Sequence, residues 1–138
     1  MKKVGIDTCI VLRLLIGEPA DQAQTSLLFL EKCYLSGTIV YVSDLIVAEV
    51  YHALCHHYHV PFREAAKKLK DFLASPMITV SGHAFTVLKE YQGTGPGFVD
   101  RLIRKDLLEH ADEILTFDKK FSMLPCVTLL DNACQTYF

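Results

Sequence analysis

Four acidic residues stand where a strand or a helix is expected to end, and they offer the chemistry of this chain. They are Asp7, Glu49, Asp100 and Asp118. Asp7 and Asp118 directly follow short apolar runs that are typical of strands. In an open parallel sheet, the carboxyl ends of the strands share one edge, and ligands bind in the crevice there. Carboxylates that are far apart in sequence are therefore expected to meet.

Carboxylates gathered at one place repel one another, which raises their pKa values and makes the cluster unstable alone. A divalent cation that prefers oxygen ligands removes this objection. Two of the acids also have a structural interpretation, because Asp7 would cap a helix that starts near Cys9 and Asp118 would cap a short turn over 119–123. Thr116 shares a strand face with Asp118, so its hydroxyl group is expected to support the site.

Asp100 is expected in the first turn of its helix, where the helix dipole favours an acid. Arg104 follows four residues later, so an ordinary ion pair between the two side chains is an alternative to a functional role. The glycine-rich segment 93–97 precedes this helix. A flexible loop there would let a large ligand reach the start of the helix.

Glu49 points away from the apolar stripe of its expected helix, so a solvated glutamate is the simple interpretation. Leu45 and Ala53 flank it on its own side, however, which makes this helix apolar nearly all round. Such a helix is predicted to be buried, and a buried glutamate requires a partner. His52 and His56 share a face with Glu49 at a spacing that suits zinc, although no third ligand is evident.

Composition restricts the class of protein. The chain has 138 residues and 51% hydrophobic residues, which favours a single domain over residues 1–138 with a core of its own. Five scattered cysteines form no Cys-x-x-Cys pair, so we expect reduced, mostly buried thiols and no disulfide framework. The apolar runs are interrupted by charges, so neither a membrane span nor a signal peptide is expected, and the predicted location is cytoplasmic.

Strands and helices alternate along the chain. Apolar and β-branched runs predict strands over residues 2–6, 38–42, 77–80, 114–117 and 127–130. Helical spacing predicts helices from Thr8 to Gly17, over 21–34, from Ser43 to 59, from Pro61 to 73, over 84–91 and over 98–110. This alternation is typical of a three-layer α/β/α domain with a mainly parallel central sheet.

The segments around the four acids resemble, in the same order, those of the PIN-domain ribonucleases, especially the VapC-like toxins of toxin–antitoxin pairs. The similar segments are residues 4–19, 43–54, 97–103 and 115–121. Each segment is short, but four in order make a fairly specific match. The resemblance implies a PIN-like fold in which the carboxylates converge.

The resemblance also implies the site. The metal-binding acids of the family correspond to Asp7, Glu49, Asp100 and Asp118, and its polar residue before the last acid corresponds to Thr116. The implied reaction is hydrolysis of single-stranded RNA with Mg²⁺ or Mn²⁺, two ions that both favour oxygen ligands. A metal-bound water would attack phosphorus and leave a 3′-hydroxyl and a 5′-phosphate.

Four basic residues are candidate phosphate contacts, and an ordinary solvated surface is the alternative for each. They are Arg101, Arg104, Lys119 and Lys120. The chain departs from the family pattern at Arg101, where a small residue is usual, and at Cys9, where Asn or Ser is commoner. The first departure concerns substrate preference, and the second concerns a hydrogen bond near the first acid.

Two other functions remain open on the sequence. A non-catalytic PIN-like binding module would act through protein or RNA contacts. Phosphoryl transfer through Asp7 is a third hypothesis, although the usual Asp-x-Asp is missing because position 9 is cysteine. The expected partners are RNA, a cognate antitoxin protein and a second copy of the chain, with no membrane. Apolar residues between Leu12 and Leu30 suit such a partner, and core packing explains them equally well.

Overall fold

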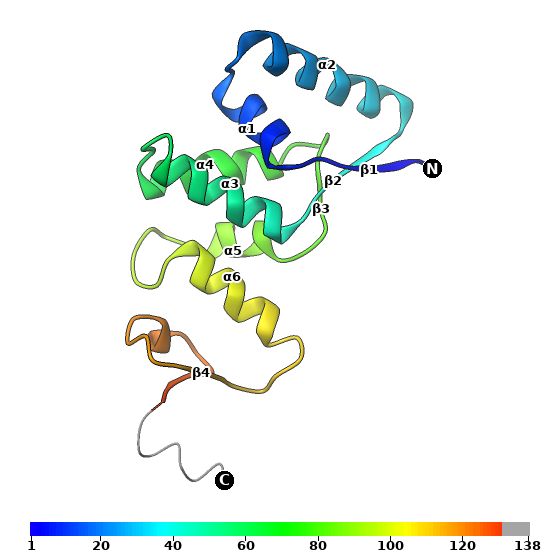
Figure 1. The fold of residues 1–138 in the computed structure, drawn as a ribbon. Coiled ribbons are helices and arrows are strands. Elements are labelled where there is room, and N and C mark those ends of the chain that lie inside the picture. Colours follow the sequence, from blue (N-terminus) through cyan, green and yellow to red (C-terminus); the bar gives the residue numbers. More distant parts are fainter. Residues whose placement is uncertain (131–138) are drawn as a thin grey trace. The chain divides into compact units, whose positions relative to one another are not determined.

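Each strand in the part of the chain that the structure describes pairs in parallel with a neighbouring strand. The computed structural model describes residues 1–130 and divides into two units, Met1–Glu90 and Tyr91–Phe138. The first unit holds a three-stranded sheet in the order β1-β2-β3, and the second holds the pair β4-β5 (Figure 1). Every pairing is parallel, which confirms the predicted α/β class and strand direction. The single-domain organisation stays a prediction.

The strands of the first unit are shorter than predicted but stand at the expected places. They are β1 (Lys3–Gly5), β2 (Ile39–Val42) and β3 (Thr79–Val80). Val40 and Val42 of the central strand are buried, whereas Ile39 and Tyr41 are only half-buried. This alternation follows from the two-residue period of a strand.

Five helices complete the first unit. They are α1 (Thr8–Ile16), α2 (Ala20–Ser36), α3 (Asp44–His56), α4 (Phe62–Leu73) and α5 (Ala84–Glu90). α1 packs on α2 and α3, and α4 packs on α3 and α5. Gly17 and Gly37 end the first two helices with φ of 81° and 79°, a conformation that glycine adopts without strain. The first helix thus ends at Gly17, where the sequence predicted its end.

The capping interpretation of Asp7 is confirmed, because its carboxylate accepts a hydrogen bond from the backbone N–H of Ile10 at the start of α1. Other predicted helix ends were wrong, and α6 ends at Leu107 rather than at 110. Pro61 is the cap of α4 rather than its first helical residue. α3 ends at His56, before the predicted 59.

The second unit is built around a small apolar cluster. It contains α6 (Phe98–Leu107), β4 (Ile114–Thr116), a short 3-10 helix η1 (Phe121–Met123) and β5 (Val127–Leu129). Ile114, Leu124 and Val127 form the cluster, with Leu108 and Phe121 packed against it. The ends of β4, α6 and η1 are therefore tied to a shared core. Across residues 1–130, each helix is too short or too polar to cross a bilayer.

The cysteines are reduced as predicted but are less buried. Cys33 is buried and Cys55 is half-buried, whereas Cys9 and Cys126 are exposed, so the expectation of mostly buried thiols was wrong. All four are free thiols. Burial raises the pKa of the Cys55 thiol, with a smaller opposing effect from Tyr51, so Cys55 is held in its unreactive protonated form. Cys134 lies outside the described residues.

The carboxylate of Asp44 connects two distant parts of the first unit. Its two oxygens accept hydrogen bonds from the backbone N–H groups of His83 (2.9 Å) and Ala84 (2.8 Å), at the start of α5. Gly82 lies so close that a side chain there would collide with this carboxylate. Two backbone N–H groups at the start of a helix are thereby satisfied by a residue about forty positions away.

Replacing Asp44 with alanine is expected to lower the free energy of unfolding by about 2 kcal/mol, because two backbone donors lose a charged acceptor. Urea unfolding of the purified protein measures this change. The control is Asp71→Ala, which removes the exposed ion pair with Lys67 and is expected to change stability by no more than about 0.5 kcal/mol. Equal effects of the two substitutions would contradict the structural role of Asp44.

Candidate functional site

Asp118 is held at the end of β4 by three hydrogen bonds. Its backbone N–H donates to the Thr116 hydroxyl oxygen (3.0 Å), and its Oδ1 accepts from the backbone N–H groups of Lys120 (2.8 Å) and Phe121 (3.1 Å). The capping interpretation of Asp118 is thus right. It does not compete with a ligand role, because within residues 1–130 both bonds fall on Oδ1 and Oδ2 accepts none.

Asp100 lies in the first turn of α6 and senses the charge of Asp118. Partial burial raises the pKa of the Asp100 carboxyl above its usual range, and the negative charge of Asp118 raises it further. The cation of Lys120 opposes this rise in pKa. The two carboxylates are therefore close enough to repel each other, and a positive charge between them would lower the energy of both ionised forms.

The predicted ion pair between Asp100 and Arg104 is not formed. Arg104 instead donates from Nε to the backbone carbonyl of Pro125, at 2.6 Å. An ion pair of this i,i+4 kind does join Lys67 to Asp71, on the exposed face of α4. Asp100 is consequently left without the neighbour that would have made its role purely structural.

The donors of Asp100 and Asp118 suit a hard divalent cation. Carboxylate oxygens are the ligands that Mg²⁺ and Mn²⁺ prefer, and an acid whose ionisation is opposed by a neighbouring acid gains most from a cation. Two carboxylates alone are a partial ligand set. Across residues 1–130, no group of three or more histidine, cysteine or acidic side chains lies close enough together to hold a metal ion.

The other two predicted acids belong to the first unit. Asp7 is exposed at the start of α1, where its Oδ1 accepts the backbone N–H of Ile10 at 3.3 Å. The next residue, Thr8, has a buried hydroxyl that finds no hydrogen-bond partner within the described residues. Asp7 is thus a weakly engaged cap, and its carboxylate remains open to solvent.

Glu49 is exposed, so the prediction of a helix buried all round was wrong. The stripe of Val47, Val50, Tyr51 and Leu54 is buried as predicted. Leu45, however, is 83% exposed, so this side of α3 is not covered. Glu49 therefore needs no partner to be stable. His52 and His56 stack with ring centroids 4.5 Å apart on the same helix, and they gather no third ligand within residues 1–130.

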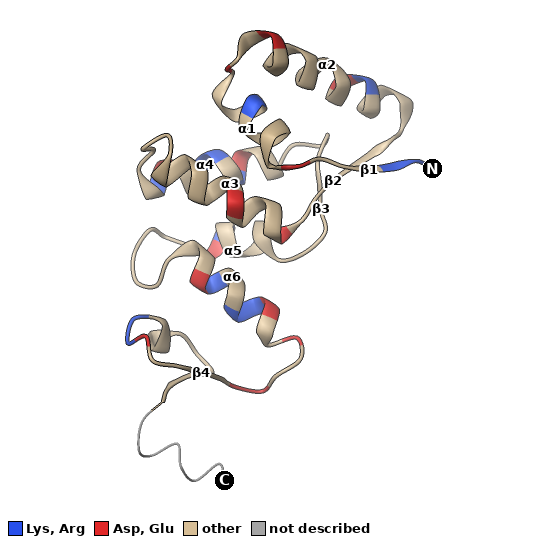
Figure 2. Cartoon of the chain, viewed as in Figure 1, with Lys and Arg blue, Asp and Glu red and all other residues tan. Residues whose placement is uncertain are grey.

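The four predicted phosphate contacts fall into two kinds. Arg101 and Arg104 are half-buried, and each guanidinium donates to backbone carbonyls of its own unit. Lys119 and Lys120 are exposed next to Asp118. Acidic and basic residues follow one another along α6, so the charges there are mixed in sign (Figure 2). The lysines are the better placed cations for a solvent-borne phosphate.

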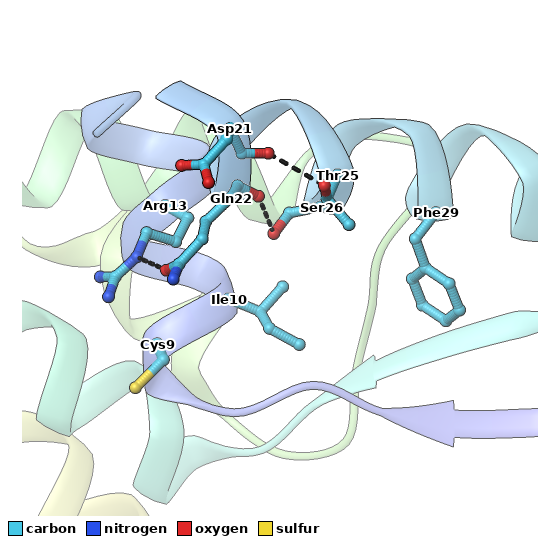
Figure 3. A pocket seen from close by; sticks show the side chains of 8 residues that line it. All are labelled: Cys9, Ile10, Arg13, Asp21, Gln22, Thr25, Ser26 and Phe29. Atoms are coloured by element: carbon cyan, nitrogen blue, oxygen red, sulfur yellow. Dashed lines mark hydrogen bonds between the residues drawn. The ribbon is translucent and has the colours of Figure 1, made fainter. Parts of the chain in front are cut away.

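A groove between α1 and α2 was not predicted from the sequence. It has a volume of about 450 Å³, and Cys9, Ile10 and Phe29 line it (Figure 3). A hydrogen bond of 2.8 Å from Arg13 Nε to Gln22 Oε1 spans the two helices beside it. The helical spacing of Cys9 and Arg13 was the available signal, but it could not show that α2 lies alongside.

Comparison with known proteins identifies the family of the chain. Residues 4–125 match the PIN domain family, a range that contains all four acidic residues and extends over parts of both units. No curated protein matches the chain.

Asp100→Asn is expected to raise the melting temperature near neutral pH. The folded-state pKa of Asp100 is raised, so ionisation opposes folding, and stability is lost as pH rises from the ordinary value of 3.8 through the folded-state pKa. The gain should vanish well below pH 3.8, where the wild-type carboxyl is protonated. Thermal unfolding in chelator across this pH range measures it, with Asp106→Asn on the same helix as control. A gain that is independent of pH would contradict the explanation.

Proposed function

Because the chain belongs to the PIN domain family, we propose that it is a metal-dependent endoribonuclease that cleaves single-stranded RNA. PIN domains are generally metal-dependent nucleases, and membership of this family therefore supports the view that the chain is a hydrolase. The observation that supports a metal-dependent mechanism in this chain is the mutual repulsion of Asp100 and Asp118, two carboxylates that a cation would stabilise. RNA as the substrate follows from the similarity of the sequence to PIN-domain ribonucleases.

In this proposal the ligands of Mg²⁺ or Mn²⁺ are Asp7, Glu49, Asp100 and Asp118. When bound, the metal would lower the pKa of a water and stabilise the leaving oxygen. The chain's own contribution is orientation. Thr116 holds the backbone of Asp118, and the two amides on Oδ1 fix its carboxylate so that Oδ2 is presented without further ordering.

We assign the phosphate contacts chiefly to Lys119 and Lys120, which are exposed beside Asp118. A net charge of −2 gives the chain no general attraction for a polyanion, so binding would depend on such local cations. Arg104 is a weaker candidate, because its Nε is engaged by the Pro125 carbonyl.

We further propose that the protein is the toxin of a type II toxin–antitoxin pair, acts in the cytoplasm, and binds a cognate antitoxin and a second copy of itself. The support is α2, on which large apolar side chains are exposed. They include Leu27, Leu28, Phe29 and Leu35. Exposed apolar residues in such number are typical of interaction surfaces.

The nuclease proposal predicts cleavage of labelled single-stranded RNA with Mg²⁺ or Mn²⁺ and none with EDTA. Asp118→Asn is expected to reduce the rate of cleavage at least about 100-fold. Changing a residue that only orients a metal ligand commonly costs about 10- to 100-fold in activity, and removing the ligand itself should cost at least as much. The cleavage rate of Thr116→Val should lie between the rates of the wild type and of Asp118→Asn. This variant keeps the carboxylate of Asp118 but removes the hydroxyl oxygen that accepts the hydrogen bond from the Asp118 backbone N–H. Gel analysis should find 5′-phosphate ends.

The matched control is Asp106→Asn, which removes an exposed carboxylate from α6 and should leave the rate unchanged. Cleavage that persists in EDTA would exclude the metal mechanism. Folded, inhibitor-free protein that binds RNA or protein but never cleaves would favour the alternative, a non-catalytic binding module.

The self-association proposal predicts a dimer in sedimentation equilibrium. Leu28 is 50% exposed on α2, and Leu28→Lys is expected to weaken the dimer by at least about tenfold because a charge would be buried in an apolar interface. Thr86→Lys adds the same charge at an exposed position of α5 and serves as the control. A monomeric wild-type protein, or equal effects of both variants, would contradict the proposal.

A further inference from the structure

The segment between α5 and α6 has a backbone that glycine makes possible. Gly93 and Gly95 have φ of 80° and 71°, in the left-handed region. Gly97 caps α6 with an extended backbone and no side-chain hydrogen bond. The helix that carries Asp100 therefore begins without the local side-chain acceptor that usually fixes a helix start.

Arg101, in the first turn of α6, holds the loop that precedes this helix by donating hydrogen bonds to the loop's carbonyl oxygens. Its Nε donates to the Pro96 carbonyl at 2.8 Å, and its Nη2 donates to the Thr94 carbonyl at 3.2 Å. The same guanidinium lies over the ring of Tyr91, 5.6 Å from the centroid. One side chain from α6 thus contacts the start, the middle and the end of the loop.

The loop is fitted closely to this guanidinium. A Cβ atom added to Gly95 would lie 3.3 Å from Nη2 of Arg101, which is tighter than an ordinary contact. The φ angle at position 95 therefore favours glycine, and a side chain there would also displace the guanidinium by a few tenths of an ångström. The glycines and the arginine form one arrangement.

Within the described residues, Arg101 forms no ion pair or hydrogen bond with the carboxylate of Asp100. The cation that opposes the raised pKa of Asp100 is Lys120, from the segment after β4. The contacts of Arg101 are to carbonyl oxygens and an aromatic ring. Its effect on the neighbouring acid is therefore geometric.

We propose that Arg101 is a positioning residue that clamps the loop 91–97 to α6 and so fixes the helix turn that presents Asp100. The part of this inference that concerns Asp100 rests on the proposed nuclease function. The clamp requires arginine, because a planar fork can donate to two carbonyls and stack on a ring, whereas a lysine ammonium is a point charge on a flexible stem. The earlier expectation of Arg101 as a phosphate contact makes the opposite prediction for lysine.

The test compares Arg101→Lys and Arg101→Ala by hydrogen exchange of the backbone amides of residues 101–104, the first amides of α6 that are hydrogen-bonded within the helix and to Gly97, without RNA or metal. Both variants should exchange at least about tenfold faster than wild type, because each loses charge-assisted hydrogen bonds that hold the loop. In nuclease assays both should lower kcat while KM and its salt dependence change little. Arg63→Lys and Arg63→Ala, at an exposed arginine of α4, are the matched controls.

A wild-type exchange rate in Arg101→Lys, with raised KM and a reduced salt slope in Arg101→Ala, would identify a phosphate contact and overturn the clamp. Circular dichroism checks folding, and Gly95→Ala is the second variant if either arginine variant unfolds. It keeps Arg101 but forces strain at φ 71°, so the amides of residues 101–104 should again exchange faster, and wild-type protection of these amides would overturn the proposal. Because hydrogen exchange is measured without substrate, an inactive wild-type protein would contradict the proposed nuclease function, and the role of Arg101 in holding the loop could still be tested.

Discussion

Repulsion between two carboxylates is the constraint around which the second unit is arranged. Asp100 is partly buried, and the negative charge of Asp118 acts on it. The burial and the neighbouring charge both disfavour the ionised form of Asp100. A folded chain tolerates this only if other interactions hold the acids in place. The amides of Lys120 and Phe121 stabilise the carboxylate of Asp118, and the small apolar cluster around Ile114 fixes the strand from which it extends. The unfavourable charge pair is thus maintained by contacts that do not neutralise it, as expected where affinity for a cation is maintained at the expense of stability.

Capping and ligand binding are compatible because a carboxylate has two oxygens. At Asp118 the backbone amides occupy Oδ1 alone, and at Asp7 a single long hydrogen bond to Ile10 does the same. Asp44 shows the other arrangement, since its two oxygens are both engaged by the start of α5. The three aspartates look alike in sequence. They differ in how many of their acceptor sites the chain's own backbone consumes, and that number decides whether an acid can also bind something else.

The sequence predicted those features that depend on local periodicity and missed those that depend on distant neighbours. Positions of strands and helices, the glycine stops and the buried stripe around Val50 follow from spacing within one element, and all were found. The burial of Glu49 was predicted wrongly, because the apolar character of Leu45 indicates only that the residue tolerates burial. Which face is covered depends on packing partners that the local pattern does not encode. The role of Asp44 was likewise invisible, since the backbone N–H donors that its carboxylate accepts from lie about forty residues away.

Basic residues illustrate the same limit at the site itself. Arg101, Arg104, Lys119 and Lys120 were equivalent as cations near an acidic motif, yet the structure separates them by the geometry of the side chain. The two arginines direct planar donors at backbone carbonyls, which rigid forks do well, and the two lysines remain in solvent. In a chain of nearly neutral net charge, cations that organise the fold are not fully available to a polyanion. Affinity for a phosphate backbone would therefore rest on few contacts, so that positioning of the acids, rather than tight electrostatic capture, would determine the rate of any reaction at this site.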